Sequence, residues 1–141
     1  MTKEQRIHKQ ANKLNVCPLM KEVKSTDELI ELFYTPQGIE FCSKNNFPSM
    51  ADIIPFRGLQ AARGGFYINT PIKLKNPKRI ALFGKDTVAE LEYDDVSQRH
   101  EVVVMHGATA KIKASGYAVV FVTNASGRIE TEETDSAKIL L

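Results

Sequence analysis

The second half of the chain repeats one pattern of apolar and polar positions three times. Each repeat joins a continuous apolar run to a segment in which apolar and polar residues alternate, a period typical of a β-strand with one buried face. Gly84, Gly107 and Asn124 separate the two kinds of segment, and these residues tolerate the backbone angles of a sharp turn. The repeats cover residues 79–95, 101–116 and 117–133. The pattern therefore predicts a repetitive β body.

A short β-solenoid accounts for this repeat, because its alternating strands would stack in phase as parallel rungs. Aligning the repeats on their apolar residues stacks Leu91, Ile112 and Ile129 on the inner face. On the outer face the same alignment gives two charged rows, Glu90–Lys111–Arg128 and Glu92–Lys113–Glu130. The strand pattern of residues 79–141 resembles that of the short β-helices of the bactofilins.

An antiparallel meander that folds into a β-sandwich or a small barrel is the alternative. The corners at 84–86, 106–107 and 124–127 would then be hairpin turns. The apolar runs of the three repeats are typical of strands buried on both faces, and they recur in phase with the alternating strands. This phase favours the solenoid.

The first half of the chain is predicted to be helical. Apolar residues recur at helical spacing over 3–15 and 26–34, Pro36 suits the first turn of a third helix, and Ser49 suits the cap of a short fourth one. Three glycines mark the segment 57–65 as a hinge. We therefore predict an α+β fold in one compact domain, with a helical cap (1–56), a Gly-rich hinge (57–65) and an all-β body (66–141). The cap is expected to cover the first rung.

Composition places the chain among soluble globular proteins. Hydrophobic residues make up 43% and charged residues 26% of the sequence. No apolar run approaches the roughly 20 residues that span a bilayer, and the polar N-terminus lacks the apolar core of a secretory signal. We expect a cytoplasmic protein, or a virion component if the chain is phage-encoded, with no membrane partner.

Charge is distributed unevenly along the chain. Residues 1–80 contain 13 Lys and Arg against 7 Asp and Glu, whereas residues 81–141 contain 6 against 10. The stretch between Asp52 and Asp86 has no acidic residue but seven basic ones, Arg57, Arg63, Lys73, Lys75, Lys78, Arg79 and Lys85. Such cations, interleaved with Phe66 and Tyr67, are compatible with a phosphate backbone. A solvated surface, or a dock for the acidic half of another copy, is the favoured interpretation.

Isolated candidates for chemistry are few. His106 lies at a corner and is the best candidate for a general base, and left-handed β-helix acyltransferases place a histidine similarly. This chain lacks their hexapeptide repeat, so a structural or exposed His106 is expected. His100 is predicted to be a solvated loop residue. Asp94 and Asp95 with Glu92 could bind a divalent cation, but an acidic turn is favoured.

The two cysteines, Cys17 and Cys42, are predicted to be buried free thiols. Their spacing with His8 matches no zinc pattern, and two cysteines do not indicate a disulfide framework. The glycines at 58, 64 and 65 fit no nucleotide-binding motif. The sequence therefore indicates no catalytic residue, no cofactor and no metal.

A structural or protein-interaction module is the function that this pattern favours, as a subunit of a larger assembly such as a phage or mobile-element particle. Two alternatives remain, a nucleic-acid-associated regulator that uses segment 57–85 and a small enzyme with a site near His106. The chain ends with the apolar residues Ile139, Leu140 and Leu141. A terminal apolar strand in water would expose an unpaired edge, so we expect another copy or another protein to cover it. Burial under the chain's own helices is the alternative.

Overall fold

The computed structural model describes residues 2–13 and 25–141 of the chain. The chain divides into two compact units between Phe66 and Tyr67. The first unit is helical and the second is a β-solenoid, as the sequence predicted. No helix in the described ranges is long and apolar enough to cross a membrane.

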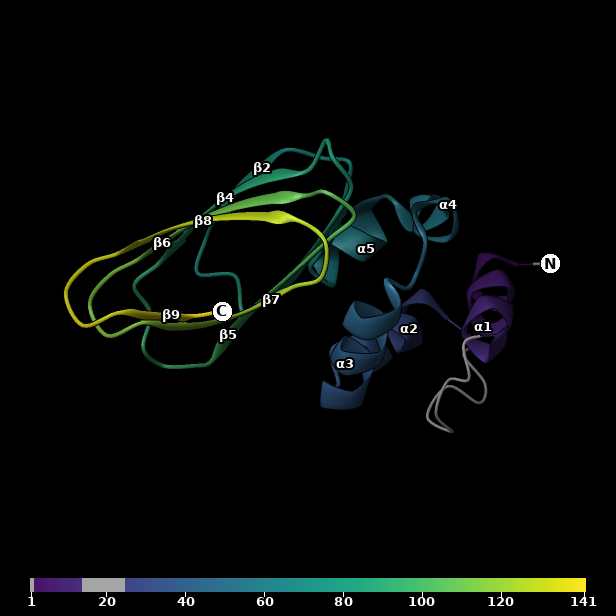
Figure 1. Ribbon diagram of the computed structural model, residues 1–141, viewed down its shortest axis with the longest axis horizontal. Helices are drawn as coiled ribbons and strands as arrows, with labels where there is room; N and C mark the ends of the chain where they lie inside the picture. The colour runs from purple at the N-terminus through teal and green to yellow at the C-terminus, as the bar shows by residue number, and fades with distance from the viewer. Residues whose placement is uncertain (1, 14–24) are drawn as a thin grey trace. The chain divides into compact units, whose positions relative to one another are not determined.

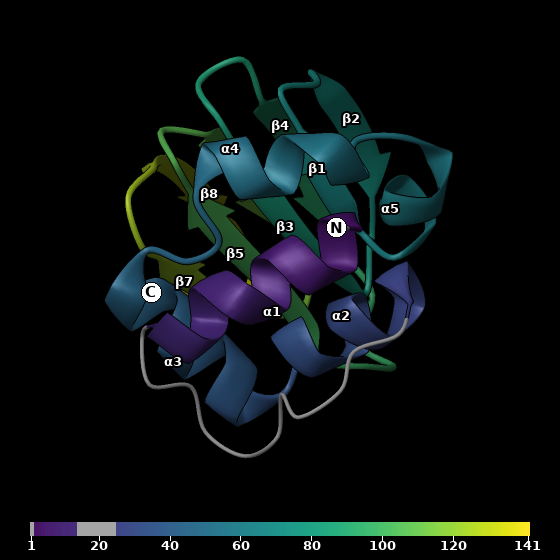
Figure 2. The ribbon, with the colours of Figure 1, turned by 90° about the vertical axis from the view of Figure 1, so that its right-hand side faces the viewer.

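Short helices make up the helical unit, and Figure 2 shows them from the side of α1. Their bounds are Lys3–Lys13 (α1), Thr26–Phe33 (α2), Pro36–Asn45 (α3), Met50–Ile53 (α4), Ile54–Phe56 (the 3-10 turn η2) and Leu59–Arg63 (α5). The predicted N-caps form, since the hydroxyls of Ser25, Thr35 and Ser49 each accept a hydrogen bond from a backbone N–H three residues later. Within the unit, Arg6 of α1 also pairs with Asp52 of α4 at 3.5 Å.

Two details of the helical half differ from the sequence prediction. Helix α1 is described only to Lys13, and the last two positions of the predicted helix lie outside the described residues. The segment predicted as a hinge contains α5, in which Ala61 is buried. The run Leu-Gln-Ala-Ala-Arg consists of good helix formers, so it supports a short helix between the flanking glycines.

The β body is a parallel β-solenoid of about four turns (Figure 1). Its strands are Phe66–Ile68 (β1), Ile72–Lys75 (β2), Arg79–Phe83 (β3), Val88–Tyr93 (β4), His100–Met105 (β5), Thr109–Ala114 (β6), Val119–Asn124 (β7), Arg128–Glu133 (β8) and Lys138–Leu140 (β9). Successive strands alternate between two sheets, ordered β1-β3-β5-β7-β9 and β2-β4-β6-β8. The strand pairs with recorded register are parallel. The antiparallel sandwich or barrel is therefore wrong.

Apolar residues from both sheets fill the interior of the solenoid. In β4 and β6 the alternate residues Ala89, Leu91, Ala110 and Ile112 are buried, while their neighbours in sequence are exposed or, at Thr109, half-buried. In β3 and β5 nearly every residue is buried, as the continuous apolar runs predicted. This difference in burial explains why β4 and β6 have alternating apolar and polar residues in the sequence, whereas β3 and β5 are continuous apolar runs.

The register of the last rung differs from the alignment made on apolar residues. Leu91 lies beside Ile112, as predicted, but Ile112 lies beside Thr131, and Ile129 lies beside Ala110. The prediction that Ile129 continues this column is therefore wrong by two residues. The alignment assumed an apolar residue at each inner position, whereas the inner positions of β8 beyond Ile129 are the exposed polar residues Thr131 and Glu133.

The corners combine backbone conformation with side-chain hydrogen bonds. Gly84 and Gly107 have φ angles of 98° and 83°, which favour glycine, as the sequence indicated. Asn124 is not among the residues with positive φ. Its amide instead accepts a hydrogen bond from the N–H of Gly127 at 2.7 Å and donates to the carbonyl of the same residue at 3.2 Å. Asn124 thus closes its corner with its side chain.

Candidate interaction surface

Strand β8 forms one edge of its sheet. The N–H groups of Arg128 and Thr134 donate to the carbonyls of Ala108 and Ala114 at 2.8 and 2.9 Å. Because backbone groups alternate in direction along a strand, Ile129, Thr131 and Glu133 direct their N–H and C=O groups away from β6. On that side no strand of the described chain pairs with β8. We call this row of backbone groups the β8 edge.

The inner face of β8 is also incompletely covered. The inner residues of β4 and β6 are buried, but on β8 Ile129 is half-buried, and Thr131 and Glu133 are exposed. On β8 the apolar packing therefore ends at Ile129. The polar, hydrogen-bonding residues of β8 follow it, and no pattern in the sequence pointed to them as a site.

The three terminal apolar residues occupy different environments. Ile139 is only 8% exposed and belongs to the solenoid core, so the expectation that it awaits a partner is wrong. It faces inward because it lies beside Val120 of β7, which in turn lies beside the buried His100 of β5. Leu140 and Leu141 are 45% and 81% exposed. These two residues remain candidates for contact.

Glu133 closes part of the same end. Lys138 donates its N–H to the carbonyl of Ala118 at 2.9 Å, so the N–H of Ile139 points away from β7. The carboxylate of Glu133 accepts that N–H at 2.8 Å. An inward-facing charged residue of this kind protects a sheet edge from further pairing. The edge of β9 is therefore partly satisfied within the chain, whereas the β8 edge is not.

The outer face of the β2-β4-β6-β8 sheet has two rows of alternating charge, which we call the charge ladders. The rows are Lys73–Glu90–Lys111–Glu130 and Lys75–Glu92–Lys113–Glu132. Opposite charges on neighbouring strands stabilise a sheet by about 0.2–1 kcal/mol per pair. The expected rows ended in Arg128 and Glu130. In the observed register Glu130 takes the place of Arg128 beside Lys111, and Glu132 takes the place of Glu130 beside Lys113. The ladders could have been found in the sequence by counting residues to the next Glu-X-Glu or Lys-X-Lys.

The basic residues of segment 57–85 are divided between the two units. Lys73 and Lys75 belong to the charge ladders, each with a glutamate as its neighbour on β4. Lys78 is exposed before β3, and Arg79 is half-buried at the first position of that strand. Arg57 and Arg63 are exposed residues of the helical unit.

A shallow groove of about 260 Å³ lies at one end of the ladders. It is lined by Lys75, Glu92, Tyr93, Asp94, Lys113, Ala114, Ser115, Glu132 and Thr134. The hydroxyl of Tyr93 is buried without a hydrogen-bond partner among the described residues, and burial raises the pKa of this phenol. Lys75 reaches Asp94 at 3.4 Å and Lys113 reaches Glu132 at 3.8 Å. The groove is therefore a continuation of the charged face.

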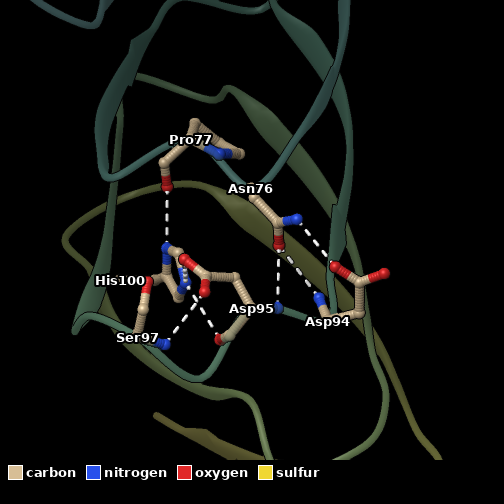
Figure 3. Close-up of polar contacts among 6 residues, drawn as sticks. All are labelled: Asn76, Pro77, Asp94, Asp95, Ser97 and His100. Carbon is tan, nitrogen blue, oxygen red and sulfur yellow. Dashed lines mark hydrogen bonds and ion pairs between the residues drawn. The ribbon is translucent and has the colours of Figure 1, made fainter.

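His100, the first residue of β5, lies in a polar cluster with the turn that precedes it (Figure 3). Its side chain is fully buried, so the prediction of a solvated loop residue is wrong. Nδ1 lies 3.1 Å from the carbonyl of Pro77, and Nε2 lies 3.3 Å from the carbonyl of Asp95. The ring also packs against Tyr93 at 4.8 Å. Sequence alone gave no indication of this burial, because Arg99 and Glu101 on either side are charged.

Asp94 and Asp95 form an acidic turn held by Asn76, as Figure 3 shows. The Asn76 amide donates to the Asp94 carboxylate at 2.7 Å, and its oxygen accepts the N–H groups of both aspartates. The hydrogen bond from Asn76, with the charge of Lys75, holds the pKa of Asp94 below its ordinary value. The N–H and side chain of Ser97, with the charge of His100, lower the pKa of Asp95. Both carboxylates are thus stabilised as anions.

The remaining candidates for chemistry, His106 and the cysteines, belong neither to the groove nor to the acidic turn. His106 occupies the β5–β6 corner with a φ of 56°, its ring 6.4 Å from that of Phe83. Cys42 is buried, which raises the pKa of its thiol to about 12, and Cys17 lies outside the described residues. Across ranges 2–13 and 25–141, no three His, Cys, Asp or Glu side chains are grouped to hold a metal ion.

Comparison with protein-family models, with curated proteins and with solved structures finds no significant match for this chain.

Proposed function

We propose that this chain is a non-enzymatic structural module that assembles with protein through the open end of its solenoid. The observation that carries the proposal is the β8 edge, where Ile129, Thr131 and Glu133 present backbone groups that no described strand pairs with. Exposed Leu140 and Leu141 lie on the same final turn. The partner is a second copy or another protein.

The physical basis is that an unpaired sheet edge is a template for another strand. An added strand gains main-chain hydrogen bonds, and its alternate side chains determine specificity. Strand β8 is six residues long and parallel to its neighbour, so it offers a regular edge rather than a frayed one. The half-exposed Ile129 gives an incoming strand apolar surface to cover.

The charge ladders favour a protein partner over nucleic acid. Nucleic-acid binding depends on cations that release counterions from phosphates. Lys73 and Lys75 each lie beside a glutamate that already offsets their charge. An outer face with both signs in register is instead suited to a protein strand of complementary charge.

Site-specific photo-crosslinking tests this proposal. A photoreactive phenylalanine analogue replaces Thr131 on the β8 edge in the full chain, and in a matched control it replaces Val96, which is 66% exposed between β4 and β5. In the cells that produce the protein, Thr131 should yield one defined adduct, identified by mass spectrometry as the chain itself or as one partner. Equal or absent crosslinking at the two positions would reject the proposed surface.

A further inference from the structure

The two edges of the β2-β4-β6-β8 sheet carry opposite charges on their outer faces. At one edge, β8 presents Glu130 and Glu132, and at the other, β2 presents Lys73 and Lys75. Across the four strands between these edges, lysine and glutamate alternate in each charge ladder. A further strand placed on β8 would continue both ladders if it carried Lys-X-Lys. The chain itself contains that strand in β2.

The direction of the backbone groups on β2 agrees with such a pairing. The N–H of Asn76 donates to the carbonyl of Glu92 at 2.8 Å, so the even-numbered residues of β2 face β4. Lys73 and Lys75 therefore direct their N–H and C=O groups to the other side. In a parallel pair, one residue bonds to the two residues that flank its partner. Thr131 would bond to Lys73 and Lys75 of another copy when it lies opposite Leu74.

We infer that the β8 edge of one copy binds the β2 edge of a second copy, in parallel and in the register that continues the charge ladders. This inference rests on the proposed function and names the partner. The register places Ile129, Glu130, Thr131 and Glu132 opposite Ile72, Lys73, Leu74 and Lys75 of the second copy. Both apolar inner positions of β2 then stack on the open inner face of β8, and both outer pairs have opposite charge.

Alternative pairings of the same edges match less well. Two β8 edges would bring their glutamates together, and two β2 edges would bring their lysines together, which is destabilising. Pro71 has no N–H, but the inferred register requires only its carbonyl, as acceptor for the N–H of Ile129. The N–H of Ile139 in the other sheet is already bound by Glu133. The contact is therefore directed to the β8 edge.

The contact uses two different surfaces, so it does not close on itself. Each copy has one β8 edge and one β2 edge, and a heterologous contact of this kind propagates into a ring or an open chain of copies. The expected behaviour in solution is a concentration-dependent series of species rather than a single dimer.

Charge exchange between the edges tests the partner. One variant of the full chain carries Lys73→Glu with Lys75→Glu, and the other carries Glu130→Lys with Glu132→Lys. Light scattering measures the assembly of each variant alone and of the two variants mixed. Each variant alone should associate at least about tenfold more weakly than the unmodified chain, and the mixture should recover association. The matched control, Lys78→Glu with Lys85→Glu, changes the same amount of charge at exposed positions outside the ladders and should assemble like the unmodified chain.

Disulfide trapping tests the register and does not depend on the stability of the charge variants. In a chain with Cys17→Ser and Cys42→Ala, one preparation carries Glu130→Cys and the other Lys73→Cys. Register partners on adjacent strands lie close enough for a disulfide, so oxidation of the mixture should give a covalent heterodimer. Glu132→Cys mixed with Lys73→Cys is displaced by two residues and should crosslink much less.

The outcomes separate this inference from the proposed function. Recovery on mixing, together with the matched disulfide, supports the inferred contact. The inferred contact is overturned if charge exchange does not change assembly, or if the disulfide forms equally in both registers. In that case the proposed function as an assembly module still stands. A chain that is monomeric at every concentration, while Thr131 crosslinks to a different protein, also overturns the contact and leaves the proposed function standing. If no adduct forms at Thr131, both the inferred contact and the proposed function are rejected.

Discussion

The carboxylate of Glu133 accepts a hydrogen bond from the backbone N–H of Ile139 at 2.8 Å, across the final turn of the solenoid. Glu133 lies at an inner position of β8, beside Ala114 in register, where earlier turns have apolar residues. The last turn therefore ends with a side chain that substitutes for the backbone of a further strand. This substitution explains how Ile139 remains buried in a strand of only three residues.

Replacing Glu133 should loosen β9. Glu133→Ala leaves the N–H of Ile139 without its acceptor and should lower the free energy of unfolding by about 1 kcal/mol. Glu133→Gln keeps an acceptor oxygen and should cost less. Urea denaturation gives the stability change, and hydrogen exchange at Ile139 locates it. Equal protection of this amide in the original chain and the alanine variant would contradict the role of Glu133.

Gly127 should tolerate no side chain. A Cβ at this position would overlap a methyl group of Val104 and would lie 2.6 Å from the carbonyl oxygen of Ala108. Because the packed interior yields little, Gly127→Ala should destabilise the fold by about 1–3 kcal/mol. Val104→Ala should reduce that penalty in a double-mutant cycle, since it removes the clashing methyl.

Gly116→Ala is the matched control for Gly127. A Cβ at Gly116 meets no atom within 4 Å, so its cost comes only from the φ of 63°. Thermal and urea unfolding of the two variants should rank Gly127→Ala as the more destabilising. The opposite ranking would show that backbone conformation outweighs packing at these corners.

The acidic turn should make stability depend on pH below the ordinary aspartate pKa of 3.8. The folded-state pKa values of Asp94 and Asp95 are lowered, so their contribution is fully present above the unfolded value. It is lost as the pH falls through the folded values. Urea denaturation at neutral and at acidic pH should show this loss.

Asn76→Gly tests the cause of that dependence, because glycine keeps the φ of 52° at this position while removing the amide. The difference in stability between neutral and acidic pH should shrink in this variant. Asn124→Gly removes a turn-closing amide that contacts only the backbone of Gly127, and it should leave the pH dependence unchanged. An equal shift in both variants would show that Asn76 does not set the pKa of Asp94.

His100 should contribute to stability through the two carbonyls that it contacts. His100→Ala removes the ring nitrogens that lie within hydrogen-bonding distance of the Pro77 and Asp95 carbonyls and should cost about 1–3 kcal/mol, in addition to the cavity it creates. Tyr93→Phe is the matched variant in the same cluster. Its hydroxyl is buried and unpartnered, so its removal should be neutral or slightly stabilising. Urea denaturation measures both changes, and a neutral His100→Ala would contradict the structural role.

Local chemistry in the sequence was sufficient to determine several features of this protein. The capping hydroxyls at Ser25, Thr35 and Ser49 act on backbone within three residues, and the alternation at Ala89 and Leu91 reflects one strand with one buried face. Such features depend on neighbours in the chain, and the phase of the repeats was enough to distinguish parallel turns from hairpins. The helix at 59–63 was missed because the flanking glycines outweighed its five helix-forming residues in that interpretation.

Tertiary structure decided the features that depend on the length of a turn. Thr131 rather than Ile129 lies beside Ile112, because the turn from β6 to β8 is two residues longer than the alignment on apolar residues assumed. The same register brings Glu130 and Glu132 into the charge ladders and leaves the β8 edge open. His100 is buried because the chain folds Pro77 and Asp95 around it, although its sequence neighbours are charged. The hydrogen-bonding partners in this cluster are 18 to 23 residues apart in the sequence. The packing of successive turns brings them together, and no local sequence pattern predicts it.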